Sequence, residues 1–197
     1  MKRIIIATNN AHKADEISHV LGMEGLEFVT LKEAGIHSDP DETETTFEGN
    51  ARIKAMAAHE LSGGAAVLAD DSGLEVDALD GAPGVFSSRF AGEDVNDLAN
   101  NALLLEKLEG IPDDERTARF VCTMVFIDED GTEKVARGAV EGRIGYGARG
   151  TEGFGYDPLF FPLAYNGEKT FAEVPQAEKN MISHRANALR EMKALLS

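Results

Sequence analysis

An apolar segment near the start of the chain constrains the fold most, because it predicts a buried strand that leads directly into a helix. Residues 2–8 are mostly apolar, and the polar turn Asn9-Asn10 follows them. Residues 11–21 then place Ile17, Val20 and Leu21 at helical spacing. Strand, loop and helix in this order form the opening unit of an α/β sheet.

The rest of the chain continues this alternation but interrupts it with a hairpin. The patterns predict strands over residues 26–31, 65–69, 119–127 and 133–140, and helices over residues 47–61, 94–108 and from near residue 183 to the end. Asp130-Gly131 separates two of the strands and predicts a β-hairpin. We therefore expect an α/β fold with a sheet of mixed direction and flanking helices, in a single domain of residues 1–197.

The charge balance narrows the choice of partner. The chain has 35 Asp and Glu against 19 Lys and Arg, a net charge of −16, which disfavours binding to a nucleic acid polymer or an anionic membrane. A small polyanion is still compatible with this charge if a bound cation and a few lysines reverse the field locally. Cys122 is the only cysteine, and no apolar run approaches the roughly 20 residues of a membrane span, so we expect a cytoplasmic protein.

Two adjacent carboxylates, Asp70 and Asp71, follow the apolar residues 65–69 and are followed by Ser72-Gly73. We expect them at the C-terminal end of a strand, where like charges this close repel unless a cation or a proton lies between them. Magnesium prefers oxygen ligands and keeps several waters, so one carboxylate could bind the ion while the other activates water. A solvated acidic turn is the alternative. The acidic loop that contains Asp41 and Glu42 could complete such a site.

Two segments have the composition of phosphate sites. The first joins a predicted strand to a predicted helix, where free backbone N–H groups favour an anion; it consists of Thr8, Asn9, Asn10, Ala11, His12 and Lys13. The alternative is that an asparagine merely caps the helix and the lysine is solvated. The second places Asn50 and Lys54 one helical turn apart on one face, where the lysine could reach phosphate oxygens. An ordinary exposed helical lysine is the alternative, and the one favoured by this pair alone.

Two further segments could recognise a nucleotide base. In residues 153–158, glycines permit close approach, aromatics could stack on a base and a carboxylate could accept hydrogen bonds from ring N–H groups; the residues are Phe154, Gly155, Tyr156 and Asp157. A tight turn with two core aromatics is the alternative. Lys179, His184 and Arg185 are the second group, and the last two begin a helix, where basic side chains oppose the dipole unless an anion or polar ligand lies opposite.

Taken in order, these blocks resemble the inosine triphosphate pyrophosphatase family, also called Ham1-like, over nearly the whole chain. The blocks that carry the resemblance are residues 8–13, 46–55, 69–74, 81–85, 153–158 and 183–185. Many blocks in the right order and spacing are far more specific than any one of them.

The resemblance implies a Mg²⁺-dependent hydrolase that cleaves ITP, dITP and XTP between the α and β phosphates and so cleanses the nucleotide pool. It also implies a homodimer and an elongated mixed fold with two lobes around a central cleft. By position, Asp71 would be the general base and a metal ligand, with Asp41 or Glu42 as a further ligand. Phosphate would be held by residues 8–13 and Lys54, and the nucleotide pocket would be lined by Ser72, Phe154, Gly155, Tyr156, Asp157, Lys179, His184 and Arg185.

One position departs from the family pattern. Gly49 stands where many relatives have glutamate before the asparagine, which affects the surroundings of the site. Two other functions fit parts of the sequence: a pyrophosphatase for modified pyrimidine or methylated nucleotides, and a nucleotide-binding regulatory module without turnover. The helix start at His184 and Arg185 argues against the first, and the intact acidic pair argues against the second.

Overall fold

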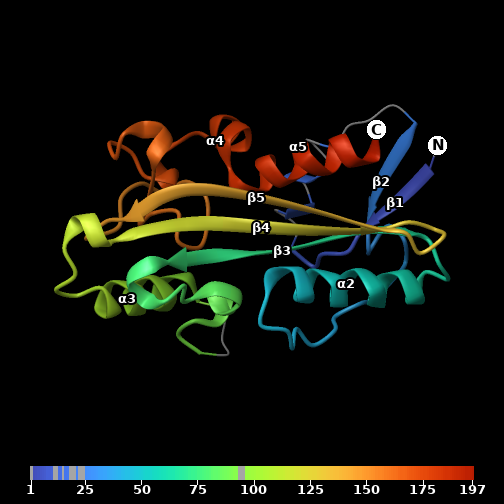
Figure 1. The fold of residues 1–197 in the computed structure, drawn as a ribbon, viewed down its shortest axis with the longest axis horizontal. Helices are drawn as coiled ribbons and strands as arrows, with labels where there is room; N and C mark the ends of the chain where they lie inside the picture. The colour runs from blue at the N-terminus through green and yellow to red at the C-terminus, as the bar shows by residue number, and fades with distance from the viewer. Residues whose placement is uncertain (1, 11–12, 15, 18–20, 22–24, 93–95) are drawn as a thin grey trace. The chain divides into compact units, whose positions relative to one another are not determined.

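The fold, seen in a computed structural model, is built on a six-stranded sheet with helices on both faces (Figure 1). The structure describes residues 2–197 apart from 11–12, 15, 18–20, 22–24 and 93–95. The strand order is β2-β1-β3-β4-β5-β6; β1 pairs in parallel with β2 and β3, whereas β5 pairs antiparallel with β6. The predicted sheet of mixed direction is therefore confirmed.

The strands are β1 (Lys2–Ile6), β2 (Leu26–Thr30), β3 (Ala66–Val76), β4 (Thr117–Ile127), β5 (Glu133–Ile144) and β6 (Phe160–Pro162). The longer helices are α2 (Phe47–Leu61), α3 (Asp97–Lys107), α4 (Gln176–Ile182) and α5 (His184–Leu196). Short 3-10 helices include Gly84–Arg89 and Phe171–Glu173. Of the helix expected over residues 11–21, the described residues 13–14 and 16–17 are helical.

The chain forms two compact units. Unit 1 consists of Met1–Asp71, Cys122–Gly138 and Arg185–Ser197, and unit 2 consists of Ser72–Val121 and Ala139–His184. Each unit has its own apolar core.

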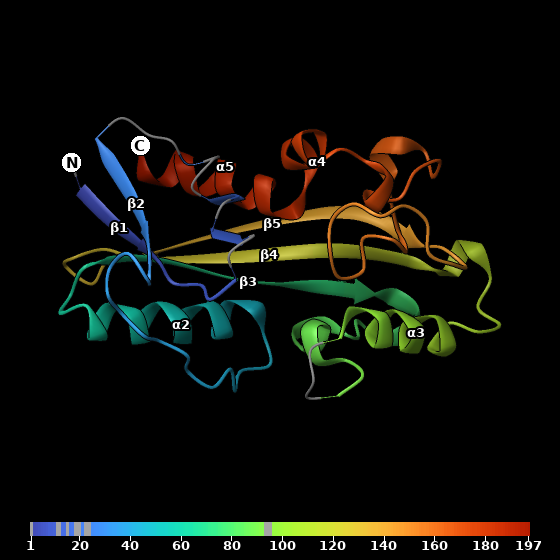
Figure 2. The ribbon, with the colours of Figure 1, turned by 180° about the vertical axis from the view of Figure 1, so that it is seen from behind.

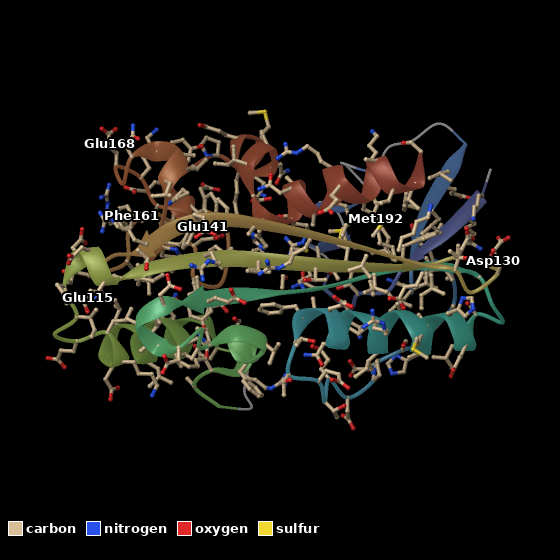
Figure 3. All side chains as sticks on the ribbon, viewed as in Figure 1. Glu115, Asp130, Glu141, Phe161, Glu168 and Met192 are labelled. Atoms are coloured by element: carbon tan, nitrogen blue, oxygen red, sulfur yellow. The ribbon has the colours of Figure 1, made fainter. Side chains whose placement is uncertain are left out.

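Unit 1 buries both faces of its part of the sheet. Helix α5 covers one face and α2 covers the other, as the two opposite views show (Figures 1 and 2). Strand β3 supplies both cores because its side chains alternate: Ala66 and Leu68 lie in the core on the α5 face, and Val67 and Ala69 in the core on the α2 face. Figure 3 shows Met192, fully buried, between α5 and the sheet.

Helix α2 begins and packs as its sequence predicts. The Thr46 side chain caps its first turn by accepting a hydrogen bond from the Gly49 backbone N–H at 3.1 Å. Ala51, Ala55 and Ala58 lie on one face and are fully buried, so the helix backbone approaches the sheet closely. The same face carries Asn50, and this places a polar side chain in the first turn beside the sheet.

Unit 2 has an aromatic core. Phe120 of β4 lies 4.6 Å from Phe160 and 6.2 Å from Phe171, measured between ring centroids. Leu104 and Leu108 of the α3 region pack into the same core. The C-terminal end of α3 is held by Arg116, which is 2% exposed and donates to the backbone oxygen of Leu108 at 2.8 Å.

The main error of the sequence prediction concerns β3. The strand was expected to end at residue 69, but it runs from Ala66 to Val76, so Asp70 and Asp71 lie inside it. Ser72-Gly73 is a typical turn pair, yet Leu74 and Val76 are fully buried and continue the alternation. Strand β5 is also longer than expected, α3 is shorter at its described end, and α4 was not predicted.

Among the described residues, no helix is both long enough and apolar enough to cross a membrane.

Candidate active site

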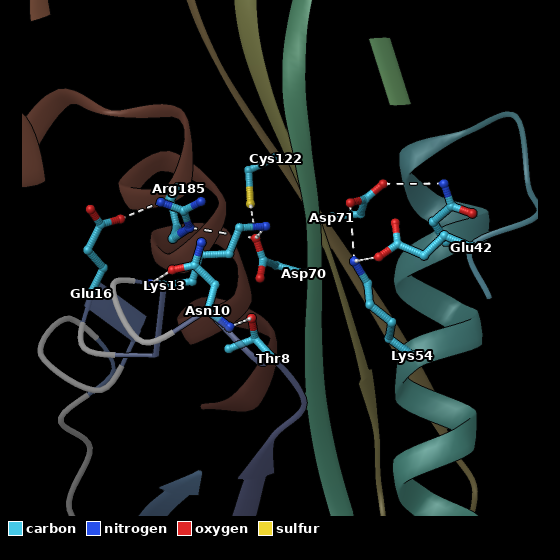
Figure 4. A network of polar contacts seen from close by, with 11 residues as sticks. Thr8, Asn10, Lys13, Glu16, Glu42, Lys54, Asp70, Asp71, Cys122 and Arg185 are labelled. Atoms are coloured by element: carbon cyan, nitrogen blue, oxygen red, sulfur yellow. Dashed lines mark hydrogen bonds and ion pairs between the residues drawn. The ribbon is translucent and has the colours of Figure 1, made fainter. Parts of the chain in front are cut away.

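Asp70 and Asp71 point to opposite faces of β3. Successive side chains of a strand alternate, so Asp70 faces α5 and Asp71 faces α2 (Figure 4). The expectation that the pair lies at the end of a strand is therefore wrong. Each has its own set of positively charged neighbours in unit 1, and the two sets define two different environments.

Asp70 lies in a buried network of alternating charges. Its Oδ2 is 3.0 Å from the Lys13 ammonium and 3.6 Å from Nε of Arg185, and Arg185 also pairs with Glu16. Burial alone would raise the pKa of Asp70, but these cations, with Lys54, hold it well below its usual range. The Cys122 thiol lies 3.9 Å from the same carboxylate, and burial raises the pKa of that thiol. Asp70 is therefore ionised and held by cations of the chain itself.

Asp71 has fewer positive neighbours and a second carboxylate close by. Its Oδ1 accepts a hydrogen bond from the Lys54 ammonium at 3.1 Å, and the same ammonium donates to Glu42 Oε1 at 3.1 Å. Asn50 Nδ2 lies 3.5 Å from the other Asp71 oxygen. Two carboxylates thus face one ammonium, and burial raises the pKa of Asp71 although Lys54 lowers it. We call Asp71, Glu42 and Lys54 the acidic centre.

The loop before α2 is tied to the acidic centre by Asn50. Its side-chain oxygen accepts a hydrogen bond from the Glu44 backbone N–H at 2.9 Å, so one buried amide connects this loop with Asp71. Glu42 consequently lies beside Asp71, whereas Asp41 is exposed. Of the two predicted ligands, Glu42 is therefore the one near Asp71.

Gly49 has a steric role in the same region. A side chain at this position would place its Cβ 2.6 Å from Glu44 Cβ and 3.1 Å from the Thr46 hydroxyl. A side chain there could be accommodated only if Glu44 moved. Glycine at position 49 thus allows Glu44 to pack against the start of α2.

The segment after β1 caps a helix and also supplies a lysine. The Asn10 side chain accepts a hydrogen bond from the Lys13 backbone N–H at 3.2 Å, and Thr8 Oγ1 accepts one from the Asn10 N–H at 3.2 Å. Asn9 donates to the backbone oxygen of Ser38 at 3.0 Å. The capping interpretation is thus correct for Asn10. The companion idea of a solvated Lys13 is wrong, because Lys13 pairs with Asp70. Ala11 and His12 lie outside the described residues.

In unit 2, Lys179 and Asp157 form a buried ion pair next to an exposed aromatic ring. Both side chains are about 4–5% exposed, and the Asp157 carboxylate also accepts a hydrogen bond from the Phe154 N–H at 3.0 Å. The Lys179 ammonium lies 5.0 Å from the centre of the Phe154 ring, which is 38% exposed. A Cβ at Gly153 would lie 2.1 Å from Asp157, so only glycine fits this turn.

The remaining predicted residues of unit 2 take several positions. Tyr156 is 4% exposed and donates its hydroxyl to the backbone oxygen of Ser87 at 2.8 Å, as expected of a core aromatic. His184 stacks on Phe120 with ring centroids 5.1 Å apart. Ser72 is half-buried on β3. Phe154 is therefore the aromatic of this segment that presents a face for stacking.

The acidic centre offers carboxylate oxygens as metal donors. Within the described parts of the chain, no three His, Cys, Asp or Glu side chains come together as an ion site. Magnesium, however, is usually held by one or two carboxylates together with substrate phosphates and waters. Asp71 and Glu42 meet that requirement, since both contact the Lys54 ammonium.

The fold and these side chains define a mixed α/β protein suited to a phosphate-bearing ligand. Comparison with known proteins gives the family. Residues 4–195 match the model of the Ham1 family. The chain is 51% identical to the dITP/XTP pyrophosphatase of Exiguobacterium sibiricum over 195 residues, 99% of this chain and 97% of that protein.

Solved structures agree with this result. The Ham1 protein of Staphylococcus aureus has a TM-score of 0.89 and 40% identity, covering 99% of this chain and 98% of that one. A HAM1 protein from Coxiella burnetii has a TM-score of 0.90 and 39% identity, covering 100% and 98%. The chain belongs to the Ham1 family, and the resemblance found in the sequence is confirmed.

Sequence reasoning did not assign a role to several residues that hold these groups. Glu16 and Cys122 are the unassigned members of the Asp70 network. Asp97 and Asn101 of α3 contact the segment that contains Phe154. Asp97 and Asn101 are residue types that are ordinary on a helix surface, so only the tertiary structure reveals their contacts.

Proposed function

We propose that this chain is a Mg²⁺-dependent nucleoside triphosphate pyrophosphatase that converts ITP, dITP and XTP to the monophosphate and pyrophosphate. Such an activity would remove non-standard purines from the nucleotide pool. The observation that carries the proposal is the acidic centre, in which Asp71 and Glu42 share Lys54. The name dITP/XTP pyrophosphatase, borne by relatives with 51% and 50% identity, supports the choice of substrate.

Asp71 and Glu42 would hold the magnesium ion. When bound, the ion offsets triphosphate charge and lowers the pKa of water. The presence of two carboxylates against one ammonium supports this placement, because the acidic centre keeps an excess of negative charge. Asp70 is the less suitable ligand, since Lys13 and Arg185 already offset its charge.

Asp71 would also act as the general base. It would accept a proton from a water whose oxygen forms a bond to the α-phosphorus, and the bond between that phosphorus and the oxygen bridging to the β-phosphorus would break. Pyrophosphate leaves with the electrons of that bond. The buried Asn50 amide beside the second oxygen of Asp71 supports this role, because it fixes the carboxylate orientation.

Lys13 and Lys54 would bind phosphate oxygens together with Thr8, Asn9, Asn10, Ala11 and His12. An ammonium group has three donors, so Lys13 can contact a phosphate while it keeps its contact with Asp70. Lys54 would exchange a carboxylate contact for phosphate. Free N–H groups at a helix start add to the attraction of these cations.

Base recognition would belong to Ser72, Phe154, Gly155, Tyr156, Asp157, Lys179, His184 and Arg185. Phe154 offers an exposed ring for stacking, with the Lys179 ammonium nearby. A donor to the 6-keto oxygen of hypoxanthine or xanthine would oppose the 6-amino group of adenine, and an unpaired buried polar group costs about 1–3 kcal/mol. His184, Arg185 and backbone N–H groups are the candidate donors.

The test is a nucleotide panel with product analysis. With Mg²⁺, purified protein should convert ITP, dITP and XTP to monophosphate and pyrophosphate much faster than ATP or GTP. Asp71→Asn should still bind ITP and should not cleave it. Release of orthophosphate, or a preference for modified pyrimidine nucleotides, would contradict the proposal, and so would unchanged turnover by Asp71→Asn.

Two further properties belong to the proposal. We expect a homodimer, as the family resemblance implies, and a location in the reducing cytoplasm, as the single cysteine suggests. Sedimentation velocity of the purified protein tests the first, and fractionation of the producing cell tests the second.

A further inference from the structure

Gly155, the residue after Phe154, forms hydrogen bonds through both its backbone N–H and its backbone oxygen to side chains of α3. The Gly155 N–H donates to Asp97 Oδ2 at 2.8 Å, and the Gly155 oxygen accepts from Asn101 Nδ2 at 3.0 Å. Asp97 and Asn101 are four residues apart and therefore lie on one face of the helix. We call these two contacts the Gly155 clamp.

Gly155 is a position that local structure alone would not hold. Its φ is +61°, a left-handed conformation that glycine adopts without strain. In a helix or a sheet, the backbone itself pairs the N–H and C=O of a residue. Gly155 lies outside both, and two side chains provide its partners. The geometry of this residue therefore depends on α3.

The orientation of the Asn101 amide is set by the clamp. Its nitrogen donates to Gly155, whereas its oxygen is buried and has no hydrogen-bond partner among the described residues. The reversed amide would bring two oxygen acceptors together, so the donating orientation is required. The neighbouring Asn100 serves another segment, since it donates to the Ser88 oxygen at 3.0 Å.

The clamp adjoins the ring that is suited to stacking. Phe154 immediately precedes Gly155, is 38% exposed and has its own N–H fixed by Asp157 at 3.0 Å. The Lys179 ammonium that pairs with Asp157 also lies 5.0 Å from the Phe154 ring centre. The Phe154 backbone is thus held on one side by Asp157 and on the other by the clamp.

We propose that Asp97 and Asn101 are positioning residues that fix Phe154 for stacking on the purine base. The inference rests on the proposed function, because it assumes a nucleotide substrate. A ring held in place before binding loses less conformational freedom when the base arrives, so the clamp strengthens binding without taking part in bond cleavage. Neither residue touches the substrate in this proposal.

The variants Asp97→Ala and Asn101→Leu remove one clamp contact each. Loss of stacking on one base corresponds to about a 5-fold to 150-fold change in affinity. We expect KM for ITP to rise toward that range while kcat stays within about twofold. Asp97→Asn keeps an acceptor for the Gly155 N–H and should restore the wild-type KM. Leu98→Ala, on the same helix at 83% exposure, is the matched control and should change neither constant.

A double-mutant cycle separates positioning from general destabilisation. In a Phe154→Ala background, Asn101→Leu should have no further effect on KM, because there is no ring left to position. Equal effects of Asn101→Leu in the two backgrounds would overturn the proposal, as would a fall in kcat at unchanged KM.

Amide hydrogen exchange of Gly155 tests the clamp without any turnover. Asp97→Ala should accelerate this exchange, and Leu98→Ala should not. Suppose that Asp97→Ala accelerates the exchange but ITP is not a substrate of the wild type. The proposed function then fails, and the positioning role for a purine base fails with it, whereas the two hydrogen bonds of the Gly155 clamp are confirmed. If exchange does not respond, the clamp is wrong whatever the activity.

Discussion

Replacement of Asp70 by asparagine should destabilise the protein strongly. Asp70 is 1% exposed, and its Oδ2 lies 3.0 Å from Lys13 Nζ and 3.6 Å from Arg185 Nε. Removal of one partner from a buried ion pair costs about 3–5 kcal/mol, because the remaining charge is buried without compensation. The asparagine oxygen can still accept from Lys13, and Arg185 keeps Glu16, so we expect about 3 kcal/mol.

This loss converts to a readily measured shift. In a chain of 197 residues, each 1 kcal/mol lowers the unfolding midpoint by about 2–4 °C, so the midpoint should fall by about 6–12 °C. Differential scanning calorimetry at pH 7 in the presence of EDTA measures it free of metal effects. The pKa of Asp70 lies below its ordinary value of 3.8, so its stabilisation is full above that pH and declines as the pH falls further.

Asp71→Asn is the matched control, since it makes the same chemical change one residue later. Burial raises the pKa of Asp71, so the folded protein disfavours its ionised form, and neutralising it at pH 7 should leave the midpoint unchanged or raise it. If Asp70→Asn and Asp71→Asn shifted the unfolding midpoint equally and in the same direction, the assignment of two different environments on the two faces of β3 would be refuted.

Three further predictions use single sites. Cys122 is fully buried beside Asp70, and burial raises the pKa of its thiol. A thiol reagent should therefore label Cys122 only as fast as the protein unfolds, and rapid labelling of native protein would contradict this. Lys54→Met should lower kcat by at least about 100-fold, because the ammonium proposed to bind phosphate oxygens beside Asp71 and Glu42 is lost, and an activity near wild type would disprove that role of Lys54. Arg119 lowers the pKa of Asp77 from its ordinary value of 3.8 by hydrogen bonding to the carboxylate. Asp77→Asn should therefore lower the free energy of unfolding by less than about 1 kcal/mol, measured in urea above that pH. In stronger acid the wild type and the variant should have the same free energy of unfolding.

The elements with strong local signals were predictable from the sequence. Helix α2 runs from Phe47 to Leu61 as expected, because a threonine cap and a row of alanines specify both its start and its buried face. The strands β1 and β2 and the hairpin between β4 and β5 also follow their patterns. In each case local propensity agrees with tertiary packing.

The error in β3 has a physical cause. Asp70 and Asp71 are poor strand residues, and Ser72-Gly73 favours a turn, so local reasoning ends the strand too early. Lys13, Lys54 and Arg185 come from distant parts of the chain and offset the cost of burying two carboxylates. No local pattern contains that information.

The functional residues divide in the same way. The spacing of Asn50 and Lys54 correctly placed both on one face of α2, and the structure shows that this face meets Asp71. For Arg185, the argument from the helix dipole correctly called for an opposing anion, but the anions are Asp70 and Glu16 of the chain itself. The partner of a charged side chain depends on contacts between distant segments, which the sequence pattern does not specify.

The most direct test of the account is cleavage of ITP in ¹⁸O-labelled water with Mg²⁺, followed by mass spectrometry of both products. If water is activated by Asp71 and attacks the α-phosphorus, one ¹⁸O atom appears in inosine monophosphate and none in pyrophosphate. Label in pyrophosphate, or formation of labelled orthophosphate, would contradict the proposed reaction at this centre.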